Sequence, residues 1–253
     1  MHIFFHIGKF AIPGYGFMIA TGVILSNIVA IFIIKKTKQD FNDFIILESY
    51  CFLGAFIGAK LLYLFVSYKE IDWTSISDLK YLNQLILAGF VFYGGLIGGL
   101  LLVLLAGKLH KIETTAYIRN FIFLIPFIHC FGRIGCFCAG CCYGIPYSGP
   151  GAIIFPEESF ALPGVSLFPV QLVEAAGLMM IALLILLLQV KFKWNYTVET
   201  YFVLYAFLRF GLENMRYDES RGFFYGLSTS QWISLFLIIA AIALFVQNKL
   251  RRR

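Results

Sequence analysis

Arginines and a carboxylate occur in segments of this chain that are otherwise strongly apolar. Arg133 lies near the end of a long apolar run, and Arg209, Glu213 and Arg216 follow at spacings of four and three residues. That spacing predicts that the last three share one face of a helix. Because arginines outnumber the carboxylate, and a guanidinium binds two phosphate oxygens at once, they favour a pocket for an anion such as a phospholipid head group. An ion-pair network that ties helices together is the alternative.

Glycines stand beside a second polar residue of an apolar segment. Tyr93 is followed directly by Gly94 and Gly95, and a further glycine pair comes two apolar residues later. Small residues let helices approach closely, which is the role we expect for the later pair. Gly94 and Gly95 are predicted instead to present backbone to a ligand.

Five of the six cysteines lie between residues 130 and 142. Cys136, Cys138, Cys141 and Cys142 could ligate zinc or an iron–sulfur cluster. However, Cys138 and Cys141 form the only Cys-x-x-Cys pair, whereas such metal sites usually combine two pairs. A disulfide or a redox-active thiol is another alternative, suited to an oxidising side of a membrane. We expect instead that the small, apolar cysteines pack the end of a helix, and we predict no metal and no cofactor.

The composition indicates an all-α, polytopic membrane protein. Of 253 residues, 60% are hydrophobic and 13% are charged, and the mean hydropathy is +0.84. A soluble domain carries about 25% charged residues. An apolar layer of about 30 Å needs about 20 helical residues to cross it. The seven segments that meet this requirement are residues 12–34, 43–66, 84–106, 117–137, 169–190, 198–216 and 230–247.

The distribution of lysine and arginine predicts the orientation. The connections after the first, third and fifth segments, together with the basic C-terminal tail, hold eleven of these residues, and the opposite face holds five. The positive-inside rule therefore places the N-terminus outside and the C-terminus in the cytoplasm. The net charge of +6 is an orientation signal and not a nucleic-acid-binding surface. Arg133, Glu174 and Arg216 then lie in the outer half of the bilayer.

The two longest connections, 67–83 and 138–168, fall on the outer side in this topology. Each has room for a short helix or a small cap. Four prolines predict mostly irregular chain in the second connection. With no internal repeat and no low-complexity tract, we expect a single domain over residues 1–253.

Several separated stretches resemble the prolipoprotein diacylglyceryl transferase family, in order and over almost the whole chain. They include the Gly-Arg-Ile-Gly run around Arg133 and the Pro-Val-Gln-Leu-Val-Glu run that ends at Glu174. The others are Ile-Pro-Gly-Tyr-Gly at 12–16, Gly-Ala-Lys-Leu at 58–61, Tyr-Gly-Gly-Leu-Ile-Gly at 93–98, Arg209 through Arg216, and Ser230, Gln231 and Ser234.

The resemblance implies an enzyme that transfers the diacylglyceryl group of phosphatidylglycerol to a cysteine thiol. The acceptor would be the lipobox cysteine in the signal peptide of a prolipoprotein, and glycerol phosphate would be released. It also implies a multi-pass protein of the bacterial inner membrane. Such a reaction needs cations at the departing phosphate and an environment that favours the thiolate.

The resemblance also implies roles for individual residues. Arg133, Arg216, Tyr93 and Glu213 are the expected catalytic residues, with Arg133 also binding phosphatidylglycerol. The expected substrate-binding residues are Arg133, Tyr15, Gly94, Gly95, Gly140, Gln171, Glu174 and Arg209.

The chain departs from the family pattern at several of these positions. Tyr93 stands where histidine is usual. After Gly-Arg-x-Gly, two asparagines and a glutamate of the usual pattern are replaced by Cys136, Ala139 and Cys141. A tyrosine has a reference pKa near 10, so Tyr93 is better suited to orienting a substrate than to acting as a base. The sequence therefore indicates a divergent, cysteine-rich branch.

Two other classes of protein stay open at this point. An anionic-lipid transporter or flippase would use the same arginines without chemistry, although transporters favour internal repeats. A thiol–disulfide redox protein would use the cysteines from Cys136 to Cys142 and would not need Arg133 or Arg216.

Overall fold

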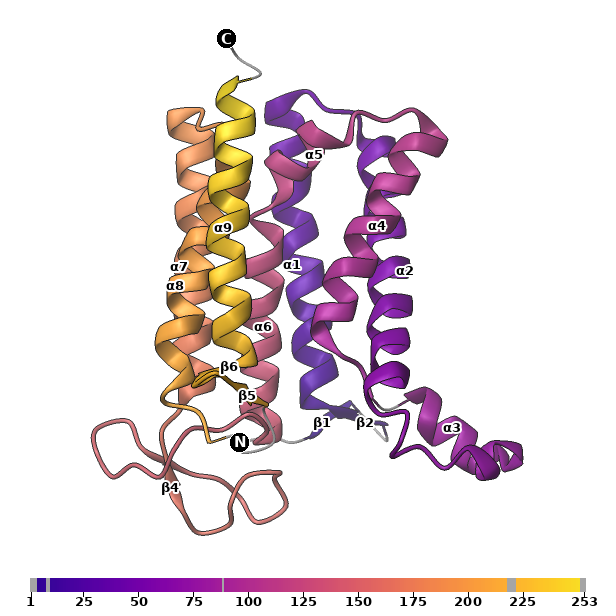
Figure 1. Cartoon of the computed structure of the whole chain (residues 1–253), viewed down its shortest axis with the longest axis vertical. Coiled ribbons are helices and arrows are strands. Elements are labelled where there is room, and N and C mark those ends of the chain that lie inside the picture. Colours follow the sequence, from indigo (N-terminus) through magenta and orange to yellow (C-terminus); the bar gives the residue numbers. More distant parts are fainter. Residues whose placement is uncertain (1–3, 8–9, 88, 218–221, 251–253) are drawn as a thin grey trace. The chain divides into compact units, whose positions relative to one another are not determined.

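The structure is a computed structural model that describes residues 4–7, 10–87, 89–217 and 222–250 (Figure 1). Five of the basic residues that predict the orientation lie outside this part of the chain, namely Lys9, Arg221, Arg251, Arg252 and Arg253. Contacts between residues divide the chain into two compact units. The first unit is Met1–Ile33 with Ile118–Arg253, and the second is Ile34–Tyr117.

Helices make up most of the described chain. They are α1 (Gly14–Thr37), α2 (Phe41–Val66), α3 (Leu79–Leu87), α4 (Phe92–His110), α5 (Thr114–Phe121), α6 (Leu124–Ala139), α7 (Val170–Phe192), α8 (Thr197–Glu213) and α9 (Thr229–Leu250). A 3-10 turn, η1 (Trp73–Ser77), precedes α3. Three short antiparallel hairpins, which the sequence did not predict, pair β1 (Phe4–Ile7) with β2 (Phe10–Pro13), β3 (Ile153–Ile154) with β4 (Ser166–Leu167), and β5 (Phe223–Phe224) with β6 (Leu227–Ser228).

Five of these helices are long and apolar enough to cross a membrane, which confirms a multi-pass membrane protein. They are α1, α2, α4, α7 and α9. The pair α5 and α6 is bent by 45° and adds a sixth span if it crosses as one. A helix rises about 1.5 Å per residue, so the 17 residues of α8 extend for only about 26 Å. The described residues therefore show five or six candidate spans where the sequence predicted seven.

Two predicted segments differ from the helices for local reasons. The predicted segment 84–106 starts too early, because α3 ends at Leu87 and Gly89 adopts a left-handed backbone (φ 72°) before α4 begins. The predicted segment 117–137 is broken between α5 and α6. In a continuous helix the ring of Pro126 would clash with the carbonyl of Ile122, which lies at the break.

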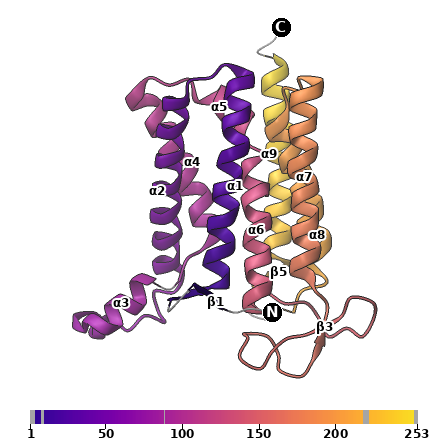
Figure 2. The same ribbon diagram turned by 180° about the vertical axis from the view of Figure 1, so that it is seen from behind.

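In the first unit, helices that follow one another in sequence pack side by side. The contacts join α6 to α7, α7 to α8 and α8 to α9, and the four run alongside each other (Figures 1 and 2). Helix α1 approaches α6 closely, because a Cβ atom added at Gly22 would lie 2.8 Å from the Cβ of Phe131. The first turns of α7 and α9 and the last turns of α6 and α8 lie at the same end of this unit, beside the 140–168 segment.

The 140–168 segment is mostly irregular, as its prolines predicted, and it forms a small cap. Phe155, Ala161 and Leu167 are buried in its centre, and Phe137 of α6 packs against them. An isolated bridge pairs Pro146 with Leu167, next to the β3–β4 hairpin. The expectation of a short helix in the other long connection is met by η1 and α3.

In the second unit, α2 and α4 pack through glycines. A Cβ atom at Gly58 would lie 2.2 Å from the carbonyl oxygen of Gly94, and one at Gly98 would lie 2.2 Å from that of Gly54. The backbones therefore meet directly, which only glycine permits here. Close packing is thus confirmed for Gly98. It also holds for Gly94, which is buried against Gly58.

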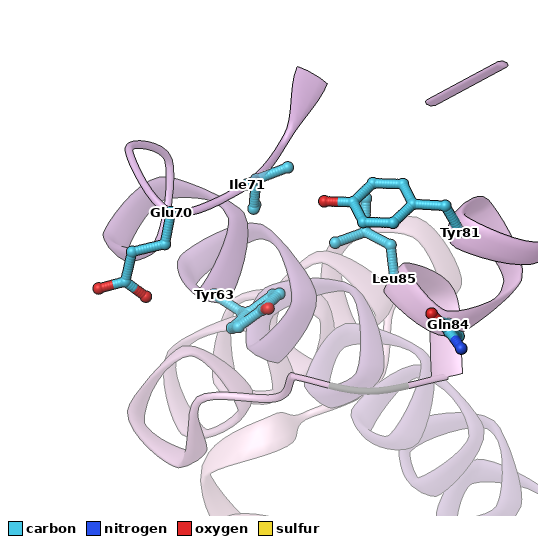
Figure 3. Close-up of a pocket in the computed structure, with 6 residues that line it drawn as sticks. All are labelled: Tyr63, Glu70, Ile71, Tyr81, Gln84 and Leu85. Atoms are coloured by element: carbon cyan, nitrogen blue, oxygen red, sulfur yellow. The ribbon is translucent and has the colours of Figure 1, made fainter. Parts of the chain in front are cut away.

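The same unit has a cavity of about 200 Å³ (Figure 3). It lies between the end of α2, the turn between α2 and η1, and α3. Tyr63, Glu70, Ile71, Tyr81, Gln84 and Leu85 line it. Nearby, the Lys60 ammonium donates a hydrogen bond to the Leu85 carbonyl and lies 4.9 Å from the centre of the Phe90 ring. Tyr81 and Leu85 come from one face of α3, so the cavity lies between that face and the end of α2 with the turn that follows it.

We predict that Gly58→Ala destabilises the protein because the added methyl group meets backbone that cannot move aside. Overpacking of this kind costs about 1–3 kcal/mol. The thermal unfolding midpoint in detergent should fall. Gly211→Ala on α8 is the matched control, since nothing lies within 4 Å of the position of its Cβ. Equal midpoints for Gly58→Ala and the wild type would contradict the direct contact between α2 and α4.

Candidate active site

Glu174 on the first turns of α7 is the centre of a buried ion cluster. Its side chain is 0% exposed. Its Oε1 lies 3.0 Å from Nη2 of Arg133, and its Oε2 lies 3.3 Å from Nη1 of Arg216 and 3.7 Å from Nη1 of Arg209. Burying a carboxylate without a partner is costly, so these guanidiniums are what allow Glu174 to be ionised inside the protein.

Arg209 makes two further contacts that fix its position. Its Nη2 lies 2.9 Å from Oε2 of Glu213, one turn later on α8, and donates a hydrogen bond of 2.9 Å to the hydroxyl of Ser230 on α9. Arg209 therefore bridges α7, α8 and α9. This placement suits the alternative role, an ion-pair network that ties helices together, in which Arg209 pairs with Glu213 one turn later.

Arg216 reaches the cluster by a route that the sequence did not predict. We expected it on one helix face with Arg209 and Glu213, but α8 ends at Glu213 and that expectation is wrong. Arg216 lies in an extended segment whose backbone forms a bridge with Gly144. A Cβ atom at Gly144 would lie 2.8 Å from the Met215 carbonyl oxygen, so glycine permits this close approach.

The cluster carries one excess positive charge. Three guanidiniums meet two carboxylates, Glu174 and Glu213. Arg133 is the most open of the three arginines, with 12% of its side chain exposed against 4% for Arg209 and 2% for Arg216. Within the described residues, its buried Nε has no hydrogen-bond partner. Arg133 is therefore the cation best placed to receive an anion.

Gln171 ties the cap to the ion cluster. It is fully buried one turn before Glu174, and its Nε2 donates a hydrogen bond of 2.9 Å to the carbonyl of Cys141. Among the described residues, its Oε1 accepts no hydrogen bond. The start of α7 thus carries Glu174, which pairs with the arginines, and Gln171, which fixes the loop after α6.

Tyr15 at the start of α1 packs against Gly135, two residues after Arg133. A Cβ atom at Gly135 would lie 3.1 Å from the Cα of Tyr15, so the second glycine of Gly-Arg-x-Gly lets the helices meet. The Tyr15 side chain itself is 45% exposed. The structure therefore brings Tyr15 to the helix turn that carries Arg133.

The remaining predicted residues fall in two places. Gly140 is the left-handed residue that ends α6 (φ 75°). Tyr93, Gly94 and Gly95 belong to the first turn of α4 in the second unit, where Tyr93 is half-buried and Gly94 contacts α2. Their assignment to catalysis or substrate binding stays a prediction.

Comparisons with known proteins agree on one family. The family "Prolipoprotein diacylglyceryl transferase" matches residues 2–247. Phosphatidylglycerol--prolipoprotein diacylglyceryl transferase 2 of Clostridium perfringens is 33% identical over 96% of this chain and 93% of its own length. The corresponding transferases of Clostridium tetani and Finegoldia magna are 33% and 28% identical over 99% and 97% of this chain, and the match covers 99% and 94% of their own lengths. The chain belongs to this family.

Three of the cysteines come close together in the structure. All six lie in the described part of the chain and are free thiols. The Sγ atoms of Cys136, Cys141 and Cys142 lie within 4.8 Å of one another, a cluster that the sequence did not predict. Hydrogen bonds with the Cys136 and Cys141 thiols, and then the charges of Arg133 and Arg216, lower the pKa of the Cys142 thiol.

We predict that Glu174→Gln destabilises this transferase-family protein strongly. Removing one partner of a buried ion pair costs about 3–5 kcal/mol, and here the arginines lose their shared carboxylate. The thermal unfolding midpoint in detergent should drop far below that of the control Glu158→Gln, which alters an exposed carboxylate of the cap. A midpoint unchanged by Glu174→Gln would show that Glu174 does not hold the cluster together.

Proposed function

We propose that this protein transfers the diacylglyceryl group of phosphatidylglycerol to the thiol of a lipobox cysteine in a prolipoprotein signal peptide. Glycerol phosphate is the second product. The observation that carries the proposal is the buried arginine cluster around Glu174, with its excess positive charge, in a chain of this family. The names of the relatives describe the same transfer.

The cluster suits the charge that this reaction moves. The acceptor sulfur attacks the glyceryl carbon that bears the phosphate, a carbon–sulfur bond forms, and the carbon–oxygen bond to the phosphate breaks. The electron pair of that bond leaves on the phosphate, whose charge therefore rises in the transition state. Guanidiniums already held in place stabilise that charge without reorganising.

The roles of the individual residues follow from their exposure and contacts. Arg133, the most open of the three arginines, binds the phosphate of the donor lipid, and Arg216 supports it from the buried side. Glu174 and Glu213 position the guanidiniums, and Arg209 joins the helices that carry them.

Further predicted residues complete the assignment. Gln171 fixes the loop beside the phosphate, Tyr15 contacts the donor lipid, and Gly140 shapes the loop. Tyr93 orients a substrate by hydrogen bonding, and Gly94 and Gly95 set the start of α4 against α2 beside it. The Tyr15 side chain is exposed next to Gly135, which supports its contact with the donor lipid.

We propose a single domain with seven membrane-spanning helices, in which α8 is the seventh span. The N-terminus lies outside and the C-terminus lies in the cytoplasm of a bacterium whose inner membrane holds the protein. In the first unit, the β1–β2 hairpin and the end of α9 lie at opposite ends of the helices, which supports termini on opposite sides (Figure 1). Basic residues end α1 and α4, as a cytoplasmic side requires.

A transporter or a thiol–disulfide protein would use parts of the same site. The family match and the transfer named for its relatives favour the transferase over both.

We predict that Arg133→Ala lowers diacylglyceryl transfer from labelled phosphatidylglycerol to a lipobox peptide by at least a hundredfold. Removing one preorganised donor to a developing oxyanion costs about two to three orders of magnitude in rate. Lys191→Ala, which removes an exposed cation from the last turn of α7, should keep wild-type activity. Full activity in folded Arg133→Ala protein would overturn the assignment of the phosphate site.

The topology predicts the behaviour of reporter fusions. Green fluorescent protein fused after Arg253 should fluoresce in a bacterium, and alkaline phosphatase at the same position should be inactive, because the phosphatase needs an oxidising compartment to form its disulfides. Fusions within the 140–168 cap should show the opposite pattern. An active phosphatase at the C-terminus would exclude seven spans with an outer N-terminus.

A further inference from the structure

Three of the six cysteines form a cluster at the end of α6. The Sγ atoms of Cys136, Cys141 and Cys142 lie within 4.8 Å of one another, and all three side chains are only partly buried. Cys138, in the same segment, is outside the group that the described residues form. Three sulfurs thus converge from one helix turn and one loop.

The backbone holds the loop back over the last turn of α6. The N–H of Gly140 donates to the carbonyls of Cys136 and Phe137, and the N–H of Cys141 donates to that of Cys136 at 3.1 Å. Cys142 then adopts a left-handed backbone (φ 54°), which is uncommon for a residue with a side chain. The hydrogen bond from Gln171 to the Cys141 carbonyl fixes the loop from outside.

The cluster lies beside the arginine cluster. Cys136 is three residues after Arg133, so both side chains lie on one face of α6. Gly144 comes two residues after Cys142, and its backbone forms the bridge with Arg216. The thiolate is the form of cysteine that binds metals, and the neighbouring Arg133 and Arg216 carry the opposite charge.

We propose that Cys136, Cys141 and Cys142 bind one zinc ion as three thiolates, and that its fourth position takes the thiol of the acceptor cysteine. Zinc–sulfur bonds of about 2.3 Å in a tetrahedron put the sulfurs about 3.8 Å apart, within the spread observed. A disulfide joins only two sulfurs, whereas here three lie within 4.8 Å of one another. Three protein ligands with an open fourth position characterise catalytic zinc sites.

The zinc ion would supply the thiolate that the transfer needs. This part of the inference rests on the proposed function. Zinc-bound acceptor thiol gives its proton to water, and the bound sulfur attacks the glyceryl carbon of the donor lipid. The carbon–sulfur bond forms, the carbon–oxygen bond breaks, and its electron pair leaves with the phosphate towards Arg133. The zinc ion keeps its charge, and no oxidant or reductant is consumed.

The sequence led us to expect neither metal nor cofactor, because the ligands come from a single short segment and not from two Cys-x-x-Cys pairs.

The metal site can be tested on the whole protein purified in detergent. After incubation with Zn²⁺ and gel filtration, the wild type should retain about one zinc ion per chain, and Co²⁺ in its place should give thiolate-to-cobalt charge-transfer absorption. Cys142→Ser and Cys141→Ser should lose at least nine-tenths of both signals. Cys138→Ser is the matched control and should keep them. Equal zinc in Cys142→Ser and the wild type, no zinc in the wild type, or a Cys136–Cys141 disulfide found by mass spectrometry would overturn the site.

A second measurement tests the role of the zinc ion in transfer. Chelation should lower activity towards a lipobox peptide at least tenfold at neutral pH, Zn²⁺ should restore it, and the metal-free protein should regain part of its activity as pH rises towards the thiol pKa of about 8.5. Unchanged activity and pH profile after zinc removal would overturn the acceptor role. An active protein without zinc refutes this inference while the transferase stands. Zinc binding with no transfer under any condition refutes the transferase while the metal site stands.

Discussion

The structure depends on one buried carboxylate that three arginines share. Glu174 is inaccessible to solvent, so its charge is tolerable only while guanidiniums from α6, from α8 and from the segment after α8 converge on it. That requirement fixes where these elements meet at one end of the first unit. Ser230 and Glu213 restrain Arg209 further, and Gln171 adds the cap to the same junction.

The same constraint underlies the proposal that the site acts on an anion. A network with equal charges would be complete in itself, whereas this one holds a surplus guanidinium charge in surroundings of low polarity. Arg133, which is the most open of the three, keeps a buried N–H without a partner among the described residues. Its position is set by Glu174 before any substrate arrives. Preorganised charge of this kind is what stabilises a leaving phosphate most effectively.

Some of this arrangement could be predicted from the sequence, and the reasons for the misses are physical. Apolar length identified most helices, since hydropathy reports burial in lipid directly. It did not reveal the break before Pro126 or the late start of α4 after Gly89, which depend on local backbone geometry. Charge counting found the surplus cation, but it could not show that Arg216 leaves the helix to pair with Gly144, because that contact spans more than seventy residues.

The cysteine cluster is a second feature that could not be predicted from sequence patterns. From spacing alone, Cys136, Cys141 and Cys142 resemble no usual metal motif, since nothing in the sequence states that Gly140 turns the chain back over the helix. Once that turn is made, Cys136 of the thiol cluster and Arg133, the proposed phosphate-binding residue, lie one helix turn apart on α6. The transfer needs its attacking sulfur within about 3–3.5 Å of a carbon that is itself bonded to the phosphate ester oxygen. A centre that holds a thiolate must therefore lie beside the centre that holds the phosphate. In the proposed site, Arg133 and Cys136 lie one helix turn apart on α6, and Cys141 and Cys142 lie in the loop that follows.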